Sequence, residues 1–195
     1  MFQVRIHGRG GQGVVTAAEI LSIAAFLEGR YAQAFPTFGS ERTGAPVVAF
    51  CRIDDRPIRV REPIARPDAL IVQDATLLRG GGVFDGLAPG AYVLVNTTRE
   101  PQVPKTAAPG RVLTVPATEL ALKHLGRPLP NAVLLGGFAA LTGVVSLDSV
   151  RAAIREKFSG RVAEGNLAAA AEAYAYVRER LPSAETFTTL EAADA

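Results

Sequence analysis

Apolar and polar positions at the start of the chain follow two different periods. Residues 2–6 alternate between apolar and polar side chains, which is the period-two pattern of a strand. From residue 14 to residue 28 apolar side chains recur at helical spacing, and Gly29 follows as a stop signal. Residues 31–35 predict a second strand that ends at Pro36. The chain is therefore predicted to open with strand, helix and strand.

Three later segments are short apolar runs bounded by turn residues. Such runs are typical of strands that are covered on both faces in a parallel sheet. They comprise residues 69–73, 92–96 and 111–115. Between the predicted strands at residues 31–35 and 69–73, a turn sequence at residues 54–57 separates residues 47–53 from residues 58–61. This pattern predicts an antiparallel hairpin. Arginines alternate along this hairpin and predict an exposed basic ribbon, made of Arg52, Arg56, Arg59 and Arg61.

Helical periodicity dominates the second half of the chain. The predicted helices cover residues 116–125, 131–141, 148–157 and 161–181. Strands that alternate with helices predict an α/β fold, here a doubly wound, mostly parallel, Rossmann-like sheet with an antiparallel hairpin insertion. We expect one domain over residues 1–182, followed by a C-terminal tail at residues 183–195.

Composition narrows the classes of function. A formal net charge of +2 with no basic stripe gives no basis for binding nucleic acid. Cys51 is the single cysteine and only two histidines occur, so we expect no metal site, disulfide or iron–sulfur cluster held by this chain alone. No signal peptide and no apolar run of about 18 residues is visible, which predicts a cytoplasmic protein without a membrane span.

The first candidate for chemistry is the glycine loop after the first strand. Gly8, Gly10 and Gly13 fit G-x-G-x-x-G between a strand and a helix, where free amides favour an anion. The same glycines, with Gly11, could merely permit a compact turn, and Gln12 could donate to a phosphate or brace the loop.

An independent dinucleotide site is the alternative that this loop raises. An NAD site usually has an acidic residue at the end of the second strand, which binds the ribose hydroxyls. This chain has Phe35 and Pro36 there, and Glu28 precedes the strand at the wrong end. A free-standing NAD(P)-binding oxidoreductase therefore stays as the alternative function, with Arg30 leaving an opening for NADP.

A second glycine-bearing loop follows at residues 35–46. Glu41 and Arg42 lie between Gly39 and Gly44, so both side chains could reach outward from a stiff frame. Arg42 would offer planar donors to a phosphate or carboxylate, or the two could form a bracing salt bridge. Near the first loop, His7 is predicted to be a structural histidine, and Asp74 is predicted to cap the helix after its strand.

The two loops, in this order, resemble the gamma subunits of the pyruvate:ferredoxin and 2-oxoacid:acceptor oxidoreductase family. That family shows G-x-G-G-Q-G and later F/Y-G-x-E-x-x-G-A/G-P, which here are residues 8–13 and 38–46. Residues 66–70, residues 92–96 and the pair Asn131 and Gly136 are similar as well, so the resemblance runs over residues 2–180. Thr43 departs from the pattern, because the family commonly has a second arginine there.

The resemblance implies a role inside a larger enzyme. That enzyme decarboxylates a 2-oxoacid such as pyruvate, 2-ketoisovalerate or an aryl-oxoacid on thiamine diphosphate with Mg²⁺, passes electrons through [4Fe-4S] clusters, and forms an acyl-CoA. The implied partners are alpha, beta and ferredoxin-like delta subunits, with an additional flavin subunit as an option. The chain itself is expected to hold no catalytic residue, and its two loops are candidates for contact with coenzyme A or a partner.

Overall fold

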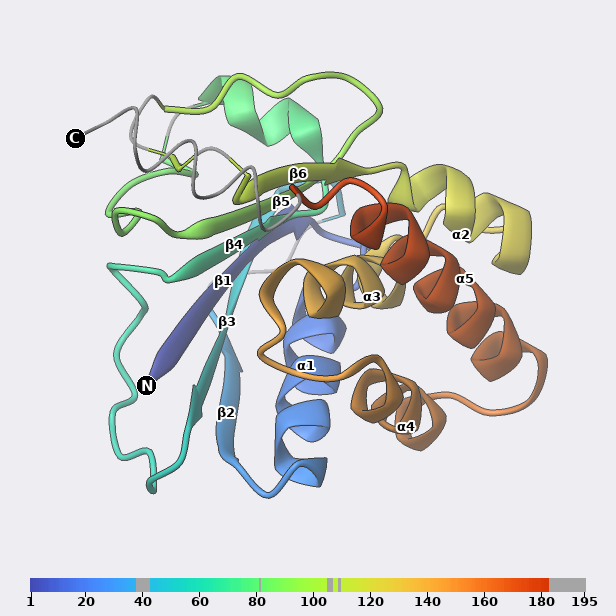
Figure 1. Cartoon of the computed structure of the whole chain (residues 1–195), viewed down its shortest axis with the longest axis horizontal. Coiled ribbons are helices and arrows are strands. Elements are labelled where there is room, and N and C mark those ends of the chain that lie inside the picture. The colour runs from blue at the N-terminus through green and yellow to red at the C-terminus, as the bar shows by residue number, and fades with distance from the viewer. Residues whose placement is uncertain (38–42, 81, 105–106, 109, 183–195) are drawn as a thin grey trace.

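The computed structural model describes residues 1–37, 43–80, 82–104, 107–108 and 110–182. Within these residues, six strands form one sheet in the order β2-β3-β1-β4-β5-β6 (Figure 1). Their bounds are β1 (Phe2–Arg9), β2 (Tyr31–Pro36), β3 (Pro46–Asp54), β4 (Ala69–Val72), β5 (Tyr92–Asn96) and β6 (Val112–Val115). The predicted strands at 31–35 and 92–96 are therefore confirmed almost to the residue.

Most of the sheet is parallel. β1, β4, β5 and β6 are parallel neighbours, whereas β3 lies antiparallel between β1 and β2. All four residues of β4 are buried, which explains why its sequence is a continuous apolar run. The predicted α/β class, with a mostly parallel Rossmann-like sheet and an antiparallel element, is confirmed.

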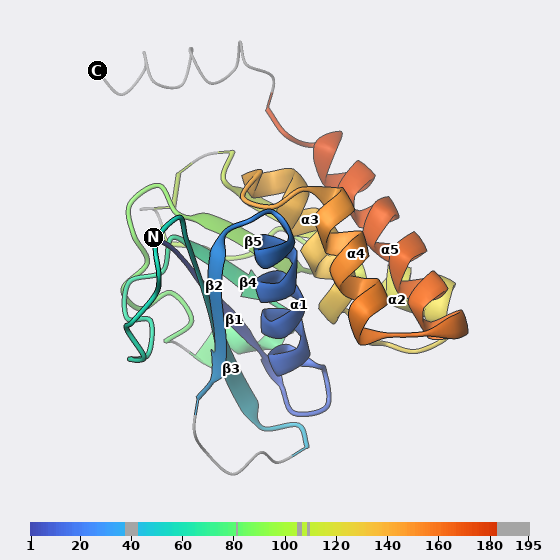
Figure 2. The same ribbon diagram turned by 90° about the horizontal axis from the view of Figure 1, so that it is seen from below.

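Among the described residues, five helices cover one face of this sheet (Figures 1 and 2). They are α1 (Val14–Leu27), α2 (Ala117–Leu125), α3 (Asn131–Thr142), α4 (Leu147–Lys157) and α5 (Gly160–Arg178). α3 is apolar around its whole circumference because it lies between the sheet and α5, and its residues Asn131 to Leu141 are all buried. Ile6 of β1 and Phe138 of α3 belong to the same fully buried core.

The opposite face has a thinner cover. A short 3-10 helix, η1 (Ala75–Gly80), and the segment after it place Leu78, Val83 and Leu87 against the sheet. These side chains pack on the outward-facing residues of β4 and β5, such as Leu70 and Val93. Figure 2 shows this layer on the side of the sheet away from the five helices.

The prediction that residues 58–61 form a hairpin strand beside β3 is wrong. Residues 57–61 form no strand, because β1 and β2 already occupy both edges of β3. The backbone carbonyls of this segment instead accept hydrogen bonds from a side chain: the guanidinium of Arg52 donates to the carbonyl oxygens of Val60 and Glu62. Arg52 is only 2% exposed, so the prediction of an exposed ribbon that includes it is also wrong.

Two boundaries differ from the prediction. β1 runs on to Arg9, because Gly8 and Arg9 pair with Val47 and Pro46 of β3, so the glycine loop is shorter than predicted. α5 ends at Arg178, and the predicted tail at residues 183–195 lies outside the described residues. In the part of the chain that is described, no helix has both the length and the apolarity to cross a membrane.

Candidate functional site

The two glycine-bearing loops meet at the carboxyl end of β1. The amide of Gly10 donates to the carbonyl oxygen of Ala45 at 2.8 Å, and the amide of Gly44 donates to the carbonyl oxygen of Gly10 at 3.0 Å. Gly10 and Thr43 form an isolated parallel bridge. The structure therefore joins Gly10 and Gly44 directly, whereas Gly39, Glu41 and Arg42 lie outside the described residues.

A polar network fixes the glycine loop to the end of β4. Gln12 accepts a hydrogen bond from the amide of Arg9 at 2.8 Å and donates to Oδ2 of Asp74 at 3.1 Å. Arg9 lies 3.2 Å from the same carboxylate and donates to the carbonyl oxygen of Gly44 at 3.0 Å. Gln12 therefore braces the loop, which was one of the two roles considered for it.

Asp74 links this network to the first residues of η1. Its Oδ1 accepts a hydrogen bond from the amide of Thr76 at 3.0 Å, so it caps η1 as predicted. Burial alone would raise the pKa of Asp74, but the hydrogen bonds from Thr76 and Gln12 and the charge of Arg9 outweigh burial and lower the pKa. Asp74 is thus held as a carboxylate whose oxygens are already engaged by the protein.

Gly13 is required by both its backbone and its surroundings. It precedes α1 in the left-handed region, with φ of 69°, where a residue with a Cβ atom is strained. A Cβ atom added there would lie 2.4 Å from Nδ2 of Asn131, at the start of α3. Gly13 therefore lets the amino ends of α1 and α3 approach each other, and Gly11 beside it is exposed.

Glu28 does not serve the alternative dinucleotide site. Its carboxylate accepts hydrogen bonds from the amide of Ser146 and the hydroxyl of Ser149, at the start of α4. Burial would raise the pKa of Glu28, but these hydrogen bonds and the charge of Arg30 lower it. Glu28 thus accepts hydrogen bonds at the amino end of α4. This site lies at the opposite end of β2 from the glycine loop.

Beside the glycine loop, on the helix face, lies a pocket of about 410 Å³. Gly11, Gly13 and Thr16 form one wall, and the rest comes from α2, α3, α5 and their connections. The pocket side chains that sequence reasoning missed are His124, Leu125, Arg127, Leu129, Phe158, Arg161, Val162 and Asn166. No local motif connects them. Of the pocket lining, the sequence motifs include only Gly11 and Gly13 of the glycine loop and Asn131, one point of the family resemblance.

His7 precedes the loop as a buried structural residue. It is 7% exposed, and its Nε2 accepts a hydrogen bond from Nε of Arg5 at 3.0 Å. Burial, and then the charge of Arg5, lower the pKa of His7 to about 4. His7 is therefore neutral at physiological pH, in agreement with its predicted structural role.

The buried neutral His7 should make the protein less stable in weak acid. The unfolded chain binds a proton to this residue below its ordinary pKa of 6.5, whereas the folded chain does so only near 4. The free energy of unfolding should therefore fall as the pH drops from 6.5 to 4, by up to about 3 kcal/mol. Urea unfolding at several pH values measures the fall, and His7→Gln should flatten it. Parallel curves for the two proteins would contradict the assignment.

Comparison with known proteins decides the family. The family described as "Pyruvate ferredoxin/flavodoxin oxidoreductase" matches residues 3–176. The chain belongs to this family. It is 51% identical to "Pyruvate/ketoisovalerate oxidoreductases common subunit gamma" of Thermococcus kodakarensis, over 89% of this chain and 96% of that protein. It is 52% identical to "Pyruvate synthase subunit PorC" of Methanosarcina barkeri, over 80% of this chain and 85% of that protein.

A solved structure agrees with this membership of the pyruvate ferredoxin/flavodoxin oxidoreductase family. Pyruvate oxidoreductase subunit PORC of Thermotoga maritima superposes with a TM-score of 0.77 at 36% identity, over 89% of this chain and 95% of that one. The resemblance to gamma subunits is confirmed, and the chain is a subunit of an oxidoreductase that acts on oxo groups.

Proposed function

We propose that the chain is the gamma subunit of a complex that oxidatively decarboxylates a 2-oxoacid to an acyl-CoA, with pyruvate or a branched 2-oxoacid as substrate. Membership of the family over residues 3–176 carries this proposal. The relative in Thermococcus kodakarensis is named as common to a pyruvate and a ketoisovalerate oxidoreductase. A subunit that two such enzymes share is not the part that selects the oxoacid, so we assign substrate choice to the partner subunits.

The thiamine diphosphate, its Mg²⁺ and the [4Fe-4S] clusters of this reaction are assigned to partner alpha, beta and delta subunits. Cys51 is the single cysteine, lies fully buried in β3, and burial raises the pKa of its thiol to about 12. A cluster ligand must be a thiolate, so this residue does not fit a cluster. Within the described ranges, no three His, Cys, Asp or Glu side chains gather closely enough to hold a metal ion.

For this chain we propose a structural role and a contact with coenzyme A through the two joined loops. Gly10 and Gly44 fix the loops to each other, and the Arg9–Gln12–Asp74 network fixes them to the sheet. Such a frame is suited to phosphate groups, because the amides of Gly11 and Gly13 make no hydrogen bond with the described residues and Arg42 adds a planar cation. Residues 1–182 are the part to which we assign this role.

Native mass spectrometry of the complex, purified through a tag on this chain, tests the subunit assignment. We expect companion subunits together with iron and thiamine diphosphate in the same sample, and acceptor reduction that requires both a 2-oxoacid and coenzyme A. A lone chain or homodimer without iron and thiamine would overturn the proposal and would favour the nucleotide-binding alternative.

The contact with coenzyme A has a separate test in that complex. Arg42→Gln is expected to raise KM for coenzyme A by about tenfold with little change in kcat, as for a lost charge-assisted hydrogen bond. Arg59→Gln is the matched control, because Arg59 is exposed and lies in the segment held by Arg52. An unchanged KM in both variants would remove the coenzyme role and leave the subunit assignment standing.

A further inference from the structure

The pocket on the helix face of the glycine loop has the size of a small-molecule site. Its volume of about 410 Å³ falls within the range of ligand pockets. Four of its lining residues lie at the starts of three helices: Gly13 and Thr16 at α1, Asn131 at α3, and Arg161 at α5. Gly10, Gly44 and Asp74, which lie at the carboxyl edge of the sheet, are not part of this lining.

Asn131 is the polar group that most needs a partner in this pocket. The residue is 5% exposed, and its side-chain amide makes no hydrogen bond with the described residues of the protein, whereas the neighbouring Asn166 donates to the carbonyl oxygen of Val162. The amide lies against Gly13, at the entrance to α1, and both residues line the pocket. The amide is not among the fully buried unpaired groups of the described residues, so it reaches the pocket and can bind a group that enters there.

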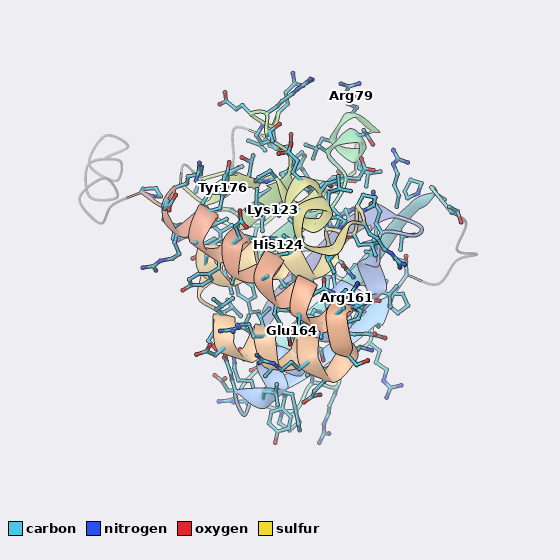
Figure 3. The ribbon with its side chains drawn as sticks, turned by 90° about the vertical axis from the view of Figure 1, so that its right-hand side faces the viewer. Arg79, Lys123, His124, Arg161, Glu164 and Tyr176 are labelled. Carbon is cyan, nitrogen blue, oxygen red and sulfur yellow. The ribbon has the colours of Figure 1, made fainter. Side chains whose placement is uncertain are left out.

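The charge of the pocket favours an anion. Arg127 and Arg161 line it, and neither forms an ion pair with a carboxylate in the described ranges. The lining contains no aspartate or glutamate, and Glu172, the nearest acid to His124, is held by that histidine at 2.6 Å and by Lys123. Figure 3 shows Arg161 at the amino end of α5, with His124 further along the same face of the molecule.

The three helices that start at the pocket lack side-chain caps. α1, α3 and α5 have no side-chain hydrogen bond at their N-caps, so their first-turn amides are left for other acceptors. The lack of a cap is not confined to these three helices, because α2 has none at Pro116 either, whereas α4 is capped by Ser146. The partial positive charge of helix amino ends adds to that of the two arginines.

The remaining walls are apolar. Leu125, Leu129, Phe158 and Val162 line the pocket beside its polar groups, and Val162 is 50% exposed although it is apolar. A bare phosphate would leave these walls in contact with water. A ligand with an anionic group at Asn131 and a flat apolar group against Phe158 would cover both parts.

We propose that this pocket binds a nucleoside phosphate, with its phosphate between Asn131, Arg127 and Arg161 and its base against the apolar wall. The ligand contacts Gly11 and Gly13 from the helix side, so a bound ligand touches the glycine loop directly. The assignment stands independently of the proposed function, because it uses none of the residues of the second loop. The nucleotide is either free or the nucleotide end of coenzyme A, which share this chemistry.

Isothermal titration of ADP into the full-length chain tests the proposal. We expect one ADP per chain, with affinity weakened by about tenfold or more in Asn131→Ala and in Arg161→Gln, as for loss of a hydrogen bond to a charged group. Arg178→Gln is the matched control: it makes the same change in the last turn of α5, near Tyr176 at the other end of the helix (Figure 3). Its affinity for ADP should equal that of the unmodified chain.

The stability of Asn131→Ala without ligand separates a binding role from a structural one. The amide has no partner in the protein, so its removal should leave the melting temperature unchanged or raise it. Competition with coenzyme A then identifies the source: displacement of ADP indicates the nucleotide end of the coenzyme, and no displacement indicates a free nucleotide. No binding of millimolar ADP, equal weakening by Arg178→Gln, or a lower melting temperature of Asn131→Ala would overturn the assignment.

Discussion

Gly136→Ala is expected to lower the free energy of unfolding by about 3 kcal/mol or more, which corresponds to about 10 °C in melting temperature. Gly136 lies on α3 where that helix crosses α5. A Cβ atom at this position would be 2.0 Å from the backbone carbonyl oxygen of Ala170. A backbone atom inside a helix cannot move alone, so the two helices must separate along their contact. Thermal unfolding followed by circular dichroism measures the effect.

Gly137→Ala is the matched control for this prediction. A Cβ atom at Gly137 would meet Cγ2 of Val177 at 3.2 Å and Cδ2 of Leu94 at 3.3 Å, and these are side-chain atoms that can shift. The gain in helix propensity of about 1 kcal/mol offsets part of that crowding. We expect a change below about 1 kcal/mol, and equal losses for the two variants would contradict the close helix crossing.

Arg5→Met should be similarly destabilising, by about 3–5 kcal/mol, although the new side chain is apolar and of comparable length. Arg5 is 7% exposed and donates to His7 and to the carbonyl oxygens of Ile64, Val83 and Asp85. Its loss leaves the buried acceptors of His7, Ile64 and Val83, and the partly buried carbonyl of Asp85, without this donor. The loops that it holds lie on the thin face of the sheet, so limited proteolysis should detect their release.

The control for Arg5 is Arg59→Met on the exposed segment. This change removes an arginine without a hydrogen bond among the described residues, and it should alter the free energy of unfolding by less than about 0.5 kcal/mol. The free energy of unfolding of Arg5→Lys should lie between those of Arg5→Met and Arg59→Met, because one ammonium replaces only part of the planar set of donors. An Arg5→Met protein as stable as the Arg59 control would show that the carbonyls find other partners.

The parallel strands and the helices are predictable from local sequence because burial sets their patterns. The strand at residues 92–96 is an apolar run that is covered on both faces, and residues 131–141 carry the helical signal of α3. The absence of a hairpin strand at residues 58–61 is not predictable, because the turn residues at 54–57 do not show that both edges of β3 are occupied. Only the long-range pairing with β1 and β2 decides that point.

The candidate site likewise has one part that is predictable from local sequence and one part that is not. The glycine loop has a local motif. The sequence left two roles for Gln12, bracing the loop or binding a phosphate, and only the structure shows its hydrogen bond to Asp74. The helix-face pocket has no motif, because Gly13, Asn131 and Arg161 are brought together by the packing of α1, α3 and α5. The burial of Arg5 was likewise missed, since an arginine in a polar position of an alternating strand indicates exposure.

The unequal covers on the two faces of the sheet divide the protein into regions of different local stability. The five-helix side contains the large apolar cluster, whereas residues 75–91 contribute only a small one on the other side. Amides in that thin layer can exchange with solvent through local opening that costs little, while those of α3 must await global unfolding. A partner subunit that docks on the thin layer would slow its exchange, so amide protection there reports assembly directly.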